Sequence, residues 1–254
     1  PISGSVLFEG SEIVGTPSRE MRTLRQKMQI IFQDPGSSLD QKMTIGEAIA
    51  EPIRIHKTLP RSEIESRVKE IMRLVALDPS FITKYPHEFS GGQRQRIGIA
   101  RAIALSPRLV ICDEPVSALD VSIKVQILNL LKDLQKELNL TYLFISHDLG
   151  VVRQISNSVA IMYLGRIVEI GEAETIFNAP LHPYTRALLS AVPRAEIRKG
   201  VEKILLSGSI PSPVDPPSGC HFHTRCPEAI EVCKKTSPIL REFPIEHWCS
   251  CHRR

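Results

Sequence analysis

The sequence predicts an α/β fold in which a parallel or mixed sheet is flanked by helices, followed by a small cysteine-rich extension. The first observation is that short apolar runs alternate with stretches of helical periodicity through most of the 254 residues. The second is a pair of glycines, Gly91 and Gly92, just before a predicted helix. The third is an apolar run, residues 109–112, that ends in the carboxylates Asp113 and Glu114. Together they predict a sheet that presents ligand-binding groups where its strands end.

The expected strands are short apolar runs bounded by turn residues. They are residues 5–8, 28–33, 109–112 and 142–145, and a hairpin of residues 159–163 and 167–170 around Leu164-Gly165-Arg166. The tripeptide Asp34-Pro35-Gly36 ends the second of them. The chain length and a hydrophobic content of 42% suit one large domain with an appendage.

The expected helices follow from apolar residues spaced three or four positions apart. A helix over residues 62–77 is indicated by Ile64, Val68, Ile71, Met72 and Val75. Further helices are expected over residues 93–105 and 121–138, with two short ones around Thr175 and Tyr184. The insertion of about residues 36–106 therefore reads as a helical subdomain, and the proline-rich residues 210–217 as a linker.

Composition narrows the classes of function. The net charge of +4, from 32 basic and 28 acidic residues, is too mild to indicate nucleic-acid binding, and aromatic residues make up only 5%. No stretch approaches the roughly 20 apolar residues of a membrane span, and no signal peptide is visible. The expected location is cytoplasmic, with any membrane role exerted through a partner.

The glycine pair and the paired carboxylates carry the predicted chemistry. A helix N-terminus with unshielded N–H groups and partial positive charge binds phosphate. Asp113 and Glu114 are adjacent, so they point to opposite faces and serve two tasks, a Mg²⁺ contact and a base. Each motif alone also has an ordinary explanation, a turn before a helix or an acidic cap. As a cap of the helix expected over residues 121–138, Asp120 fits better than Asp113, because Pro115 lies between Asp113 and that helix.

Taken in order, these motifs resemble the ATP-binding cassette (ABC) ATPases. Residues 89–96 resemble the signature motif, residues 109–114 the Walker B strand and residues 117–120 the D-loop, while Gln33 and His147 match the Q-loop glutamine and the switch histidine. The resemblance implies an ABC-type P-loop NTPase domain over residues 1–190, including the helical signature subdomain, and a C-terminal extension over residues 191–254. It also implies ATP and Mg²⁺ as ligands.

The resemblance assigns roles residue by residue. Glu114 is expected to polarise the attacking water and His147 to contact the γ-phosphate, so both are the expected catalytic residues. Nucleotide-binding roles are implied for Gln33, Asp113, Ser90, Gly91, Gly92, Gln93 and Asp120. Among them, Asp113 is expected to hold the Mg²⁺ shell, and the signature residues to grip ATP bound to the opposite subunit of a sandwich dimer.

Further segments, residues 37–39, 43–47, 85–89 and 182–189, resemble the oligopeptide/dipeptide import branch. Residues 89–96 and 114–117 look more like the second of its two ATPases. The resemblance implies a subunit on the cytoplasmic face of the membrane that energises import of peptides or related solutes. The implied partners are a second ABC ATPase subunit, two transmembrane permease subunits and, indirectly, an extracytoplasmic solute-binding protein. One alternative is a non-hydrolysing regulatory or signature-donating subunit. Another is a DNA-repair or ribosomal ABC ATPase, for which a coiled-coil insertion or paired cassettes would be expected and are not seen.

One departure from the family concerns the phosphate-binding loop. None of the 14 glycines is followed by lysine, so the P-loop pattern does not occur in these residues. Residues 1–8 resemble family sequence downstream of the Walker A loop. The expectation is a chain that begins after its P-loop, either by truncation or as a natural short form. Residues 1–254 alone are therefore expected not to hydrolyse ATP.

Five of the six cysteines lie near the end of the chain, and Cys112 reads as a small buried hydrophobe. Cys220, Cys226, Cys233 and Cys251 resemble the cysteines of the branch's C-terminal extension and are the expected metal ligands. Their intervals of five, six and seventeen residues fit tetrahedral zinc poorly, so a [4Fe-4S] cluster is expected. A zinc site and four reduced thiols are the alternatives.

Overall fold

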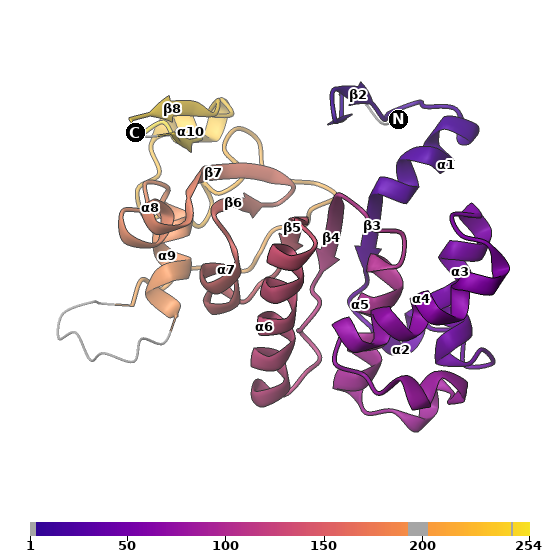
Figure 1. Cartoon of the computed structure of the whole chain (residues 1–254). Coiled ribbons are helices and arrows are strands. Elements are labelled where there is room, and N and C mark those ends of the chain that lie inside the picture. Colours follow the sequence, from indigo (N-terminus) through magenta and orange to yellow (C-terminus); the bar gives the residue numbers. More distant parts are fainter. Residues whose placement is uncertain (1–3, 193–202, 245) are drawn as a thin grey trace. The chain divides into compact units, whose positions relative to one another are not determined.

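The structure is a computed structural model that describes residues 4–192, 203–244 and 246–254 (Figure 1). The chain divides into two compact units, Pro1–His147 and Asp148–Arg254, called unit 1 and unit 2 below. The boundary expected at residues 190/191 falls inside unit 2 and stays a prediction about the family's domain organisation. Residues 193–202 of the expected extension lie outside the described residues.

Unit 1 contains two short sheets and a group of helices (Figure 1). Its strands are β1 (Leu7–Phe8), β2 (Ser11–Glu12), β3 (Met28–Ile31), β4 (Leu109–Asp113) and β5 (Thr141–Ile145). Its helices are α1 (Ser18–Lys27), α2 (Pro35–Ser38), α3 (Ile45–His56), α4 (Arg61–Leu74), η1 (Pro79–Thr83), η2 (Pro86–Glu88), α5 (Gly91–Ile103) and α6 (Val121–Glu137). The expected strands and helices of this part are confirmed, with the first two strands shorter than expected. The ten-residue helix α1 was not foreseen.

The central sheet of unit 1 has the order β3-β4-β5, and both pairs of strands are parallel. Its register aligns Ile30 with Ile111 and Ile111 with Leu143, while Asp113 lies beside Ile145. Parallel strands end at the same edge of a sheet. The polar residues that follow β3, β4 and β5 therefore start from one edge.

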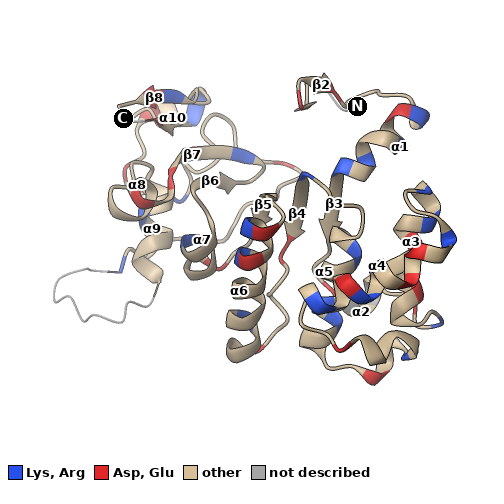
Figure 2. Cartoon of the chain, viewed as in Figure 1, with Lys and Arg blue, Asp and Glu red and all other residues tan. Residues whose placement is uncertain are grey.

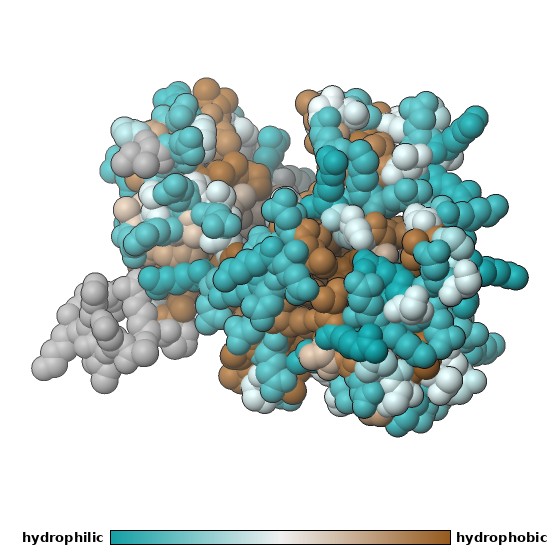
Figure 3. All heavy atoms as spheres, in the orientation of Figure 1, coloured by the Kyte–Doolittle hydropathy of each residue, from teal (hydrophilic) through white to brown (hydrophobic). Residues whose placement is uncertain are grey.

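One face of this sheet is apolar and exposed. Leu143 is 53% exposed, Ile145 46% and Ile30 38%, and Figure 3 shows apolar atoms at the surface where the strands of unit 1 lie. The opposite face carries Val110 and Cys112, which are fully buried. Burial raises the pKa of the Cys112 thiol to about 12, so this cysteine is a protonated core residue, as the sequence predicted.

The helical subdomain is built on α3, α4 and α5, which pack around a common core. Ile49, Ile71 and Ile97 are fully buried there. A reciprocal capping box starts α3: the Glu47 N–H donates to Thr44 Oγ1 at 3.2 Å, and the Thr44 N–H donates to Glu47 Oε2 at 2.8 Å. Acidic and basic residues both lie along the outer side of α4 (Figure 2), where i,i+4 and i,i+3 ion pairs form, such as Lys69–Glu65.

Gly46 is a point of close packing between α3 and η1. A Cβ built on Gly46 would lie 2.7 Å from the backbone oxygen of Ile82, which cannot move aside cheaply. We expect Gly46→Ala to destabilise the chain by about 1–3 kcal/mol through overpacking, measured by denaturant unfolding. The matched control is Gly98→Ala on α5, where a Cβ meets nothing within 4 Å. This control is expected to stabilise by roughly 0.5–1 kcal/mol. Equal effects of the two changes would contradict the packing described for α3.

Unit 2 contains a mixed set of helices and one antiparallel sheet. Its elements are α7 (Leu149–Ile155), β6 (Ser158–Tyr163), β7 (Arg166–Glu172), α8 (Ala173–Asn178), α9 (Pro183–Ala191), α10 (Glu231–Lys235), β8 (Arg241–Phe243) and β9 (His247–Cys249). The expected hairpin is confirmed as β6 and β7, with Leu164 and Gly165 both at positive φ, as in the tight turns that suit twisted hairpins.

The C-terminal strands complete this sheet, which has the order β6-β7-β9-β8. Phe222, 1% exposed, fills the core beneath it, with ring centroids 5.2 Å from Tyr163 and 5.3 Å from Tyr184. The last residues of the chain are therefore part of the core of unit 2. Among the described residues, no helix combines the length and apolar character needed to cross a bilayer.

Candidate active site at the strand ends of unit 1

Glu114 lies at the centre of the candidate site, directly after β4. Its carboxylate contacts residues that follow the two neighbouring strands. Gln33 Nε2 donates to Glu114 Oε2 at 2.7 Å, and His147 Nδ1 donates to Glu114 Oε1 at 2.8 Å. The structure thus brings together three of the residues that the sequence singled out. Gln33 lies 81 positions before Glu114, and His147 lies 33 positions after it.

The electrostatics of Glu114 favour its charged form. The hydrogen bond from His147 is the largest cause that lowers the pKa of the Glu114 carboxyl below its ordinary value, and desolvation opposes it. The side chain of Glu114 is 22% exposed and that of His147 is 73% exposed. An ionised carboxylate with partial access to solvent can orient and polarise a water molecule.

The backbone at Glu114 adopts an uncommon conformation, with φ of 43°. A non-glycine residue in this left-handed region costs on the order of 1–3 kcal/mol, and the cost is tolerated where the surroundings fix it. The Glu114 N–H donates to the Ile145 carbonyl at 3.0 Å, and the Ser117 N–H donates to the Glu114 carbonyl at 3.2 Å. The strand β5 and the following turn together hold this conformation.

Asp113 is half-buried at the end of β4, one residue before Glu114. Its position beside the last residue of β5 places a carboxylate at the same edge as Glu114. Mg²⁺ is commonly held by one or two carboxylates with substrate phosphates and water, so a single strand-end aspartate fits this ion. The role of Asp113 as a Mg²⁺ contact stays a prediction.

The signature residues form the start of helix α5. Ser90 is the N-cap: its Oγ accepts from the Gln93 N–H at 3.4 Å, and Gln93 Oε1 accepts from the Ser90 N–H at 3.0 Å. A Cβ on Gly92 would lie 2.5 Å from Ile123 Cγ2, so this glycine allows α5 to approach α6. A Cβ on Gly91 would meet only Leu119 Cδ2, at an ordinary 3.7 Å. Packing therefore explains glycine at position 92 and leaves position 91 unexplained.

Asp120 is the N-cap of α6, as the sequence favoured. Its Oδ1 accepts from the Ile123 N–H at 3.0 Å and from the Ser122 hydroxyl at 2.8 Å. The backbone hydrogen bond of Ile123 is the largest cause that lowers the pKa of this carboxyl. Asp120 has a structural role within its own chain, and its predicted contact across a dimer stays a prediction.

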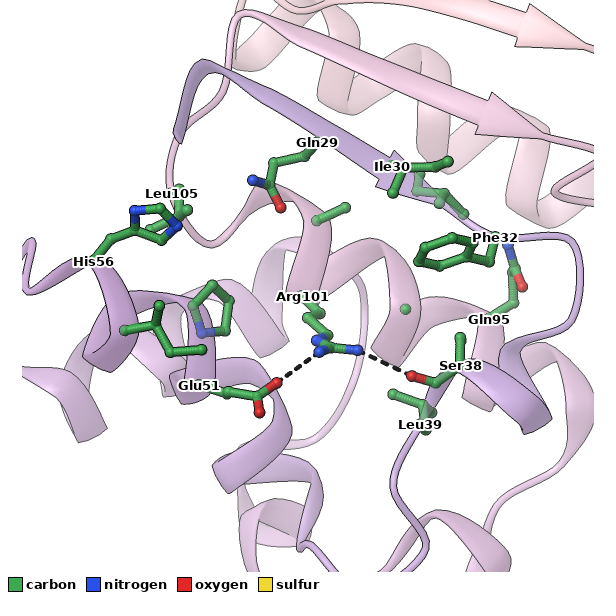
Figure 4. Close-up of a pocket in the computed structure, with 15 residues that line it drawn as sticks. Gln29, Ile30, Phe32, Ser38, Leu39, Glu51, His56, Gln95, Arg101 and Leu105 are labelled. Atoms are coloured by element: carbon green, nitrogen blue, oxygen red, sulfur yellow. Dashed lines mark hydrogen bonds and ion pairs between the residues drawn. The ribbon is translucent and has the colours of Figure 1, made fainter. Parts of the chain in front are cut away.

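A groove of about 200 Å³ lies between β3, α3 and α5, close to Gln33 along the chain (Figure 4). Arg101 crosses its floor and donates to Glu51 Oε2 at 2.6 Å and to the Ser38 carbonyl at 2.9 Å. Phe32, 49% exposed, and Ile55, 50% exposed, supply apolar surface to its lining.

Two buried polar atoms of this groove lack a hydrogen-bond partner within the part of the chain that the structure describes. They are Nε2 of Gln95, a residue only 1% exposed, and Nδ1 of His56. Burial lowers the pKa of His56, so its ring is neutral at neutral pH. Buried polar groups are normally paired, and leaving one unpaired costs about 1–3 kcal/mol. No sequence pattern indicates these unpaired atoms, because they depend on how three elements pack.

The predicted cysteine ligands share one region of unit 2 without forming a metal site. Cys220 and Cys226 pack against the core around Phe222, and the Cys220 N–H donates to the Cys233 carbonyl at 2.8 Å. Burial is the largest cause that raises the pKa of Cys220, Cys226 and Cys251, to about 11 for Cys226. In residues 4–192, 203–244 and 246–254, no group of three or more His, Cys, Asp or Glu is arranged to hold a metal ion. The expected [4Fe-4S] cluster is therefore not supported by the arrangement of these thiols.

A buried polar cluster in unit 2 was missed from sequence. Glu169, fully buried, accepts from the N–H groups of Leu181 at 2.6 Å and His182 at 3.0 Å, and from His247 Nε2 at 2.7 Å. Its carboxylate links β7, the start of α9 and β9. Burial lowers the pKa of His182 to about 4, so that ring is neutral. The sequence identifies the segment from His182 to Leu189 only by its resemblance to the family branch. Its partner Glu169 is not recognisable from sequence, because it lies inside an ordinary apolar strand.

The comparisons with known proteins agree with this geometry. Residues 1–117 match the family described as "ABC transporter", and residues 168–233 match "Oligopeptide/dipeptide transporter, C-terminal region". The structure of cbiO1 from Clostridium perfringens, part of the ABC transporter complex cbiONQ, superposes with a TM-score of 0.63 at 29% identity, covering 70% of this chain and 69% of that one. The fold is thus that of an ABC-type ATPase.

Two curated relatives narrow the class. The oligopeptide transport ATP-binding protein OppF of Escherichia coli strain K12 is 54% identical over 98% of this chain and 75% of its own length. The oligopeptide transport ATP-binding protein AppF of Bacillus subtilis strain 168 is 50% identical over 99% of this chain and 78% of its own length. The chain belongs to the oligopeptide/dipeptide branch of the ABC transporter ATP-binding proteins, a family of ATPases.

Proposed function

We propose that this chain is the ATP-hydrolysing subunit that energises import of peptides or related solutes across the cytoplasmic membrane. The observation that carries the proposal is the Glu114 carboxylate held by His147 and Gln33 at the strand ends. The names of the relatives, which are oligopeptide transport ATP-binding proteins, supply the solute class. The proposed location is the cytoplasmic face of the membrane, with the subunit bound peripherally to its transporter.

In this proposal each residue of the site has one task. Glu114, kept ionised by His147, orients the water that attacks the γ-phosphate. His147 also faces solvent, and in the imidazolium form its ring donates from Nδ1 to Glu114 and can donate from Nε2 to the γ-phosphate as charge develops there. Asp113 contributes a carboxylate to Mg²⁺, and Gln33 senses the ion and the water. The start of α5, residues 90–93, with Asp120, serves the ATP bound by a second ABC ATPase subunit of a sandwich dimer.

The groove of Figure 4 is the proposed contact for one of two transmembrane permease subunits. It combines exposed apolar side chains with two buried atoms, on Gln95 and His56, that a docked polar backbone would satisfy. Ile31 and Phe32 line the groove, and Gln33, which contacts Glu114, follows them directly. Movement of a docked segment against Ile31 and Phe32 would therefore displace the adjacent Gln33 and change its hydrogen bond with Glu114.

We expect Ile55→Asp to weaken attachment to the permeases at least about tenfold, because it buries a charge in an apolar contact. The measurement is co-purification of the subunit with the membrane complex. The control is Val6→Asp, since Val6 is 51% exposed and Ile55 50%. Undiminished attachment of the Ile55 variant would contradict this placement of the permease.

The function is tested by uptake of labelled oligopeptides, dipeptides and nickel chelates in cells that lack the gene and carry it back on a plasmid. Restored uptake of a peptide by the wild-type gene, and failure of Glu114→Gln to restore it, are expected. Restored uptake with the Glu114 variant would favour the non-hydrolysing regulatory subunit. An extracytoplasmic solute-binding protein is the expected further component for such uptake.

The cysteine-rich extension carries a separate prediction, a [4Fe-4S] cluster on Cys220, Cys226, Cys233 and Cys251 with Cys249 dispensable. Its support is the family resemblance together with the closeness of Cys220 and Cys233, since the Cys220 N–H donates to the Cys233 carbonyl at 2.8 Å. Anaerobic purification with iron, sulfide and zinc analysis is expected to give about four irons per chain. One zinc per chain would favour a zinc site, and no metal would leave four reduced thiols.

A further inference from the structure

Ser117 holds the carbonyl of Glu114 with two of its own groups. Its hydroxyl donates to the Glu114 carbonyl at 3.0 Å, and its backbone N–H donates to the same oxygen at 3.2 Å. Ser117 is half-buried in the turn that follows β4. These two hydrogen bonds are called the Ser117 clamp below, and a substitution can remove the one from the hydroxyl.

The clamp acts on the residue whose backbone is left-handed. With φ of 43°, Glu114 turns directly after β4 and aims its carboxylate at two residues that follow other strands. Both carboxylate oxygens of Glu114 are then hydrogen-bonded: Oε1 accepts from His147, and Oε2 accepts from Gln33. A relaxed, extended backbone would redirect the side chain by changing the direction of its Cβ. Both contacts depend on the turn being kept.

We propose that Ser117 is a positioning residue for ATP hydrolysis, which holds the left-handed turn at Glu114 and so keeps the carboxylate aimed at its water. The role is exerted within one chain and is separate from the dimer contact that the D-loop resemblance implies for this segment. It rests on the role proposed for Glu114.

The test compares Ser117→Ala with Ser117→Thr, which keeps the hydroxyl, in the complete gene product assembled in its transporter. Ser117→Ala is expected to lower kcat for ATP about tenfold while KM changes less than about twofold. Ser117→Thr is expected to restore kcat to within about threefold.

The matched control is Ser66→Ala on α4, where a hydroxyl also donates to the carbonyl three residues earlier, at 2.8 Å from Glu63. This control is expected to leave kcat unchanged. Should Ser117→Ala fold poorly by its unfolding midpoint, Ser117→Cys, which keeps the size and weakens the donor, gives the same comparison.

A double variant separates positioning from general damage. Because Ser117 acts through Glu114, adding Ser117→Ala to Glu114→Gln is expected to leave the residual single-turnover rate unchanged. A further loss of about tenfold in the double variant, or a kcat of Ser117→Ala within twofold of wild type, would overturn the inference. If Glu114→Gln itself kept wild-type kcat, the proposed role of Glu114 would fail instead.

Discussion

Replacing Glu114 by glutamine is expected to lower ATP turnover by about 10²–10³-fold or more while nucleotide binding stays within a few-fold of wild type. The amide has the same size and can still accept from Gln33 and His147 in part, so the fold is preserved. It cannot polarise water as an ionised carboxylate does, and the loss falls on the chemical step. The measurement pairs steady-state ATPase rates with equilibrium binding of ATP, using the complete gene product in its transporter.

The control for this substitution is Glu137→Gln at the end of α6, an exposed carboxylate that precedes β5, whereas His147 of the site follows β5. It is expected to leave both rate and binding unchanged. A Glu114→Gln protein with kcat within threefold of wild type would show that another group orients the water. Parallel loss of ATP binding would show that Glu114 is a structural contact of the nucleotide.

The parts of this site that local sequence determines were predicted correctly. Short apolar strands, each followed by a polar residue, placed Gln33, Glu114 and His147 at one sheet edge, because parallel strands end together. The cap at Asp120 also follows from residues close along the chain, since Asp120 accepts from the N–H of Ile123. Such features need only the spacing of residues within one or two elements.

The parts that depend on distant contacts were not predictable in the same way. The left-handed conformation of Glu114 is held in part by a hydrogen bond to the carbonyl of Ile145, thirty-one positions later. A glutamate at position 114 does not by itself indicate a left-handed backbone. The unpaired atom of Gln95 arises from packing of α5 against β3 and α3. The pairing of β9 with β7, in which Trp248 lies beside Ile170, joins strands that are far apart in the sequence and could not be predicted from either strand alone. Long-range register of this kind is not encoded in periodicity.

In the cysteine-rich extension, the prediction from family resemblance goes beyond what the structure shows. Family resemblance groups Cys220, Cys226, Cys233 and Cys251 as metal ligands, whereas in this structure Cys220 and Cys226 pack against the core around Phe222 and Cys233 is buried. Raised thiol pKa values favour protonated sulfur, whereas metal binding needs thiolates. Metal binding there would need a rearrangement of the extension, which the metal analysis described above would reveal.

Replacing Gly91 by aspartate is expected to disable the nucleotide site of the partner ATPase and to spare the site on the same chain. The side chain fits locally, since a Cβ at position 91 meets only Leu119 Cδ2 at 3.7 Å. The added carboxylate lies at the N-terminus of α5, where a triphosphate from the facing subunit is expected. Two like charges about 4 Å apart repel by about 4 kcal/mol at an effective dielectric constant of 20, which is a loss of roughly 10²–10³-fold in affinity.

The measurement uses a mixed dimer in which only this subunit carries Gly91→Asp, with a photoreactive ATP analogue to report labelling of each subunit separately. Labelling of the partner's nucleotide site is expected to fall by at least about 100-fold, while the site of the substituted chain is labelled as in wild type. The neutral change Gly91→Ala adds the Cβ without the charge and is expected to cost far less. Loss confined to the substituted chain's own site would contradict the sandwich dimer, because the start of α5 would then serve the nucleotide in cis.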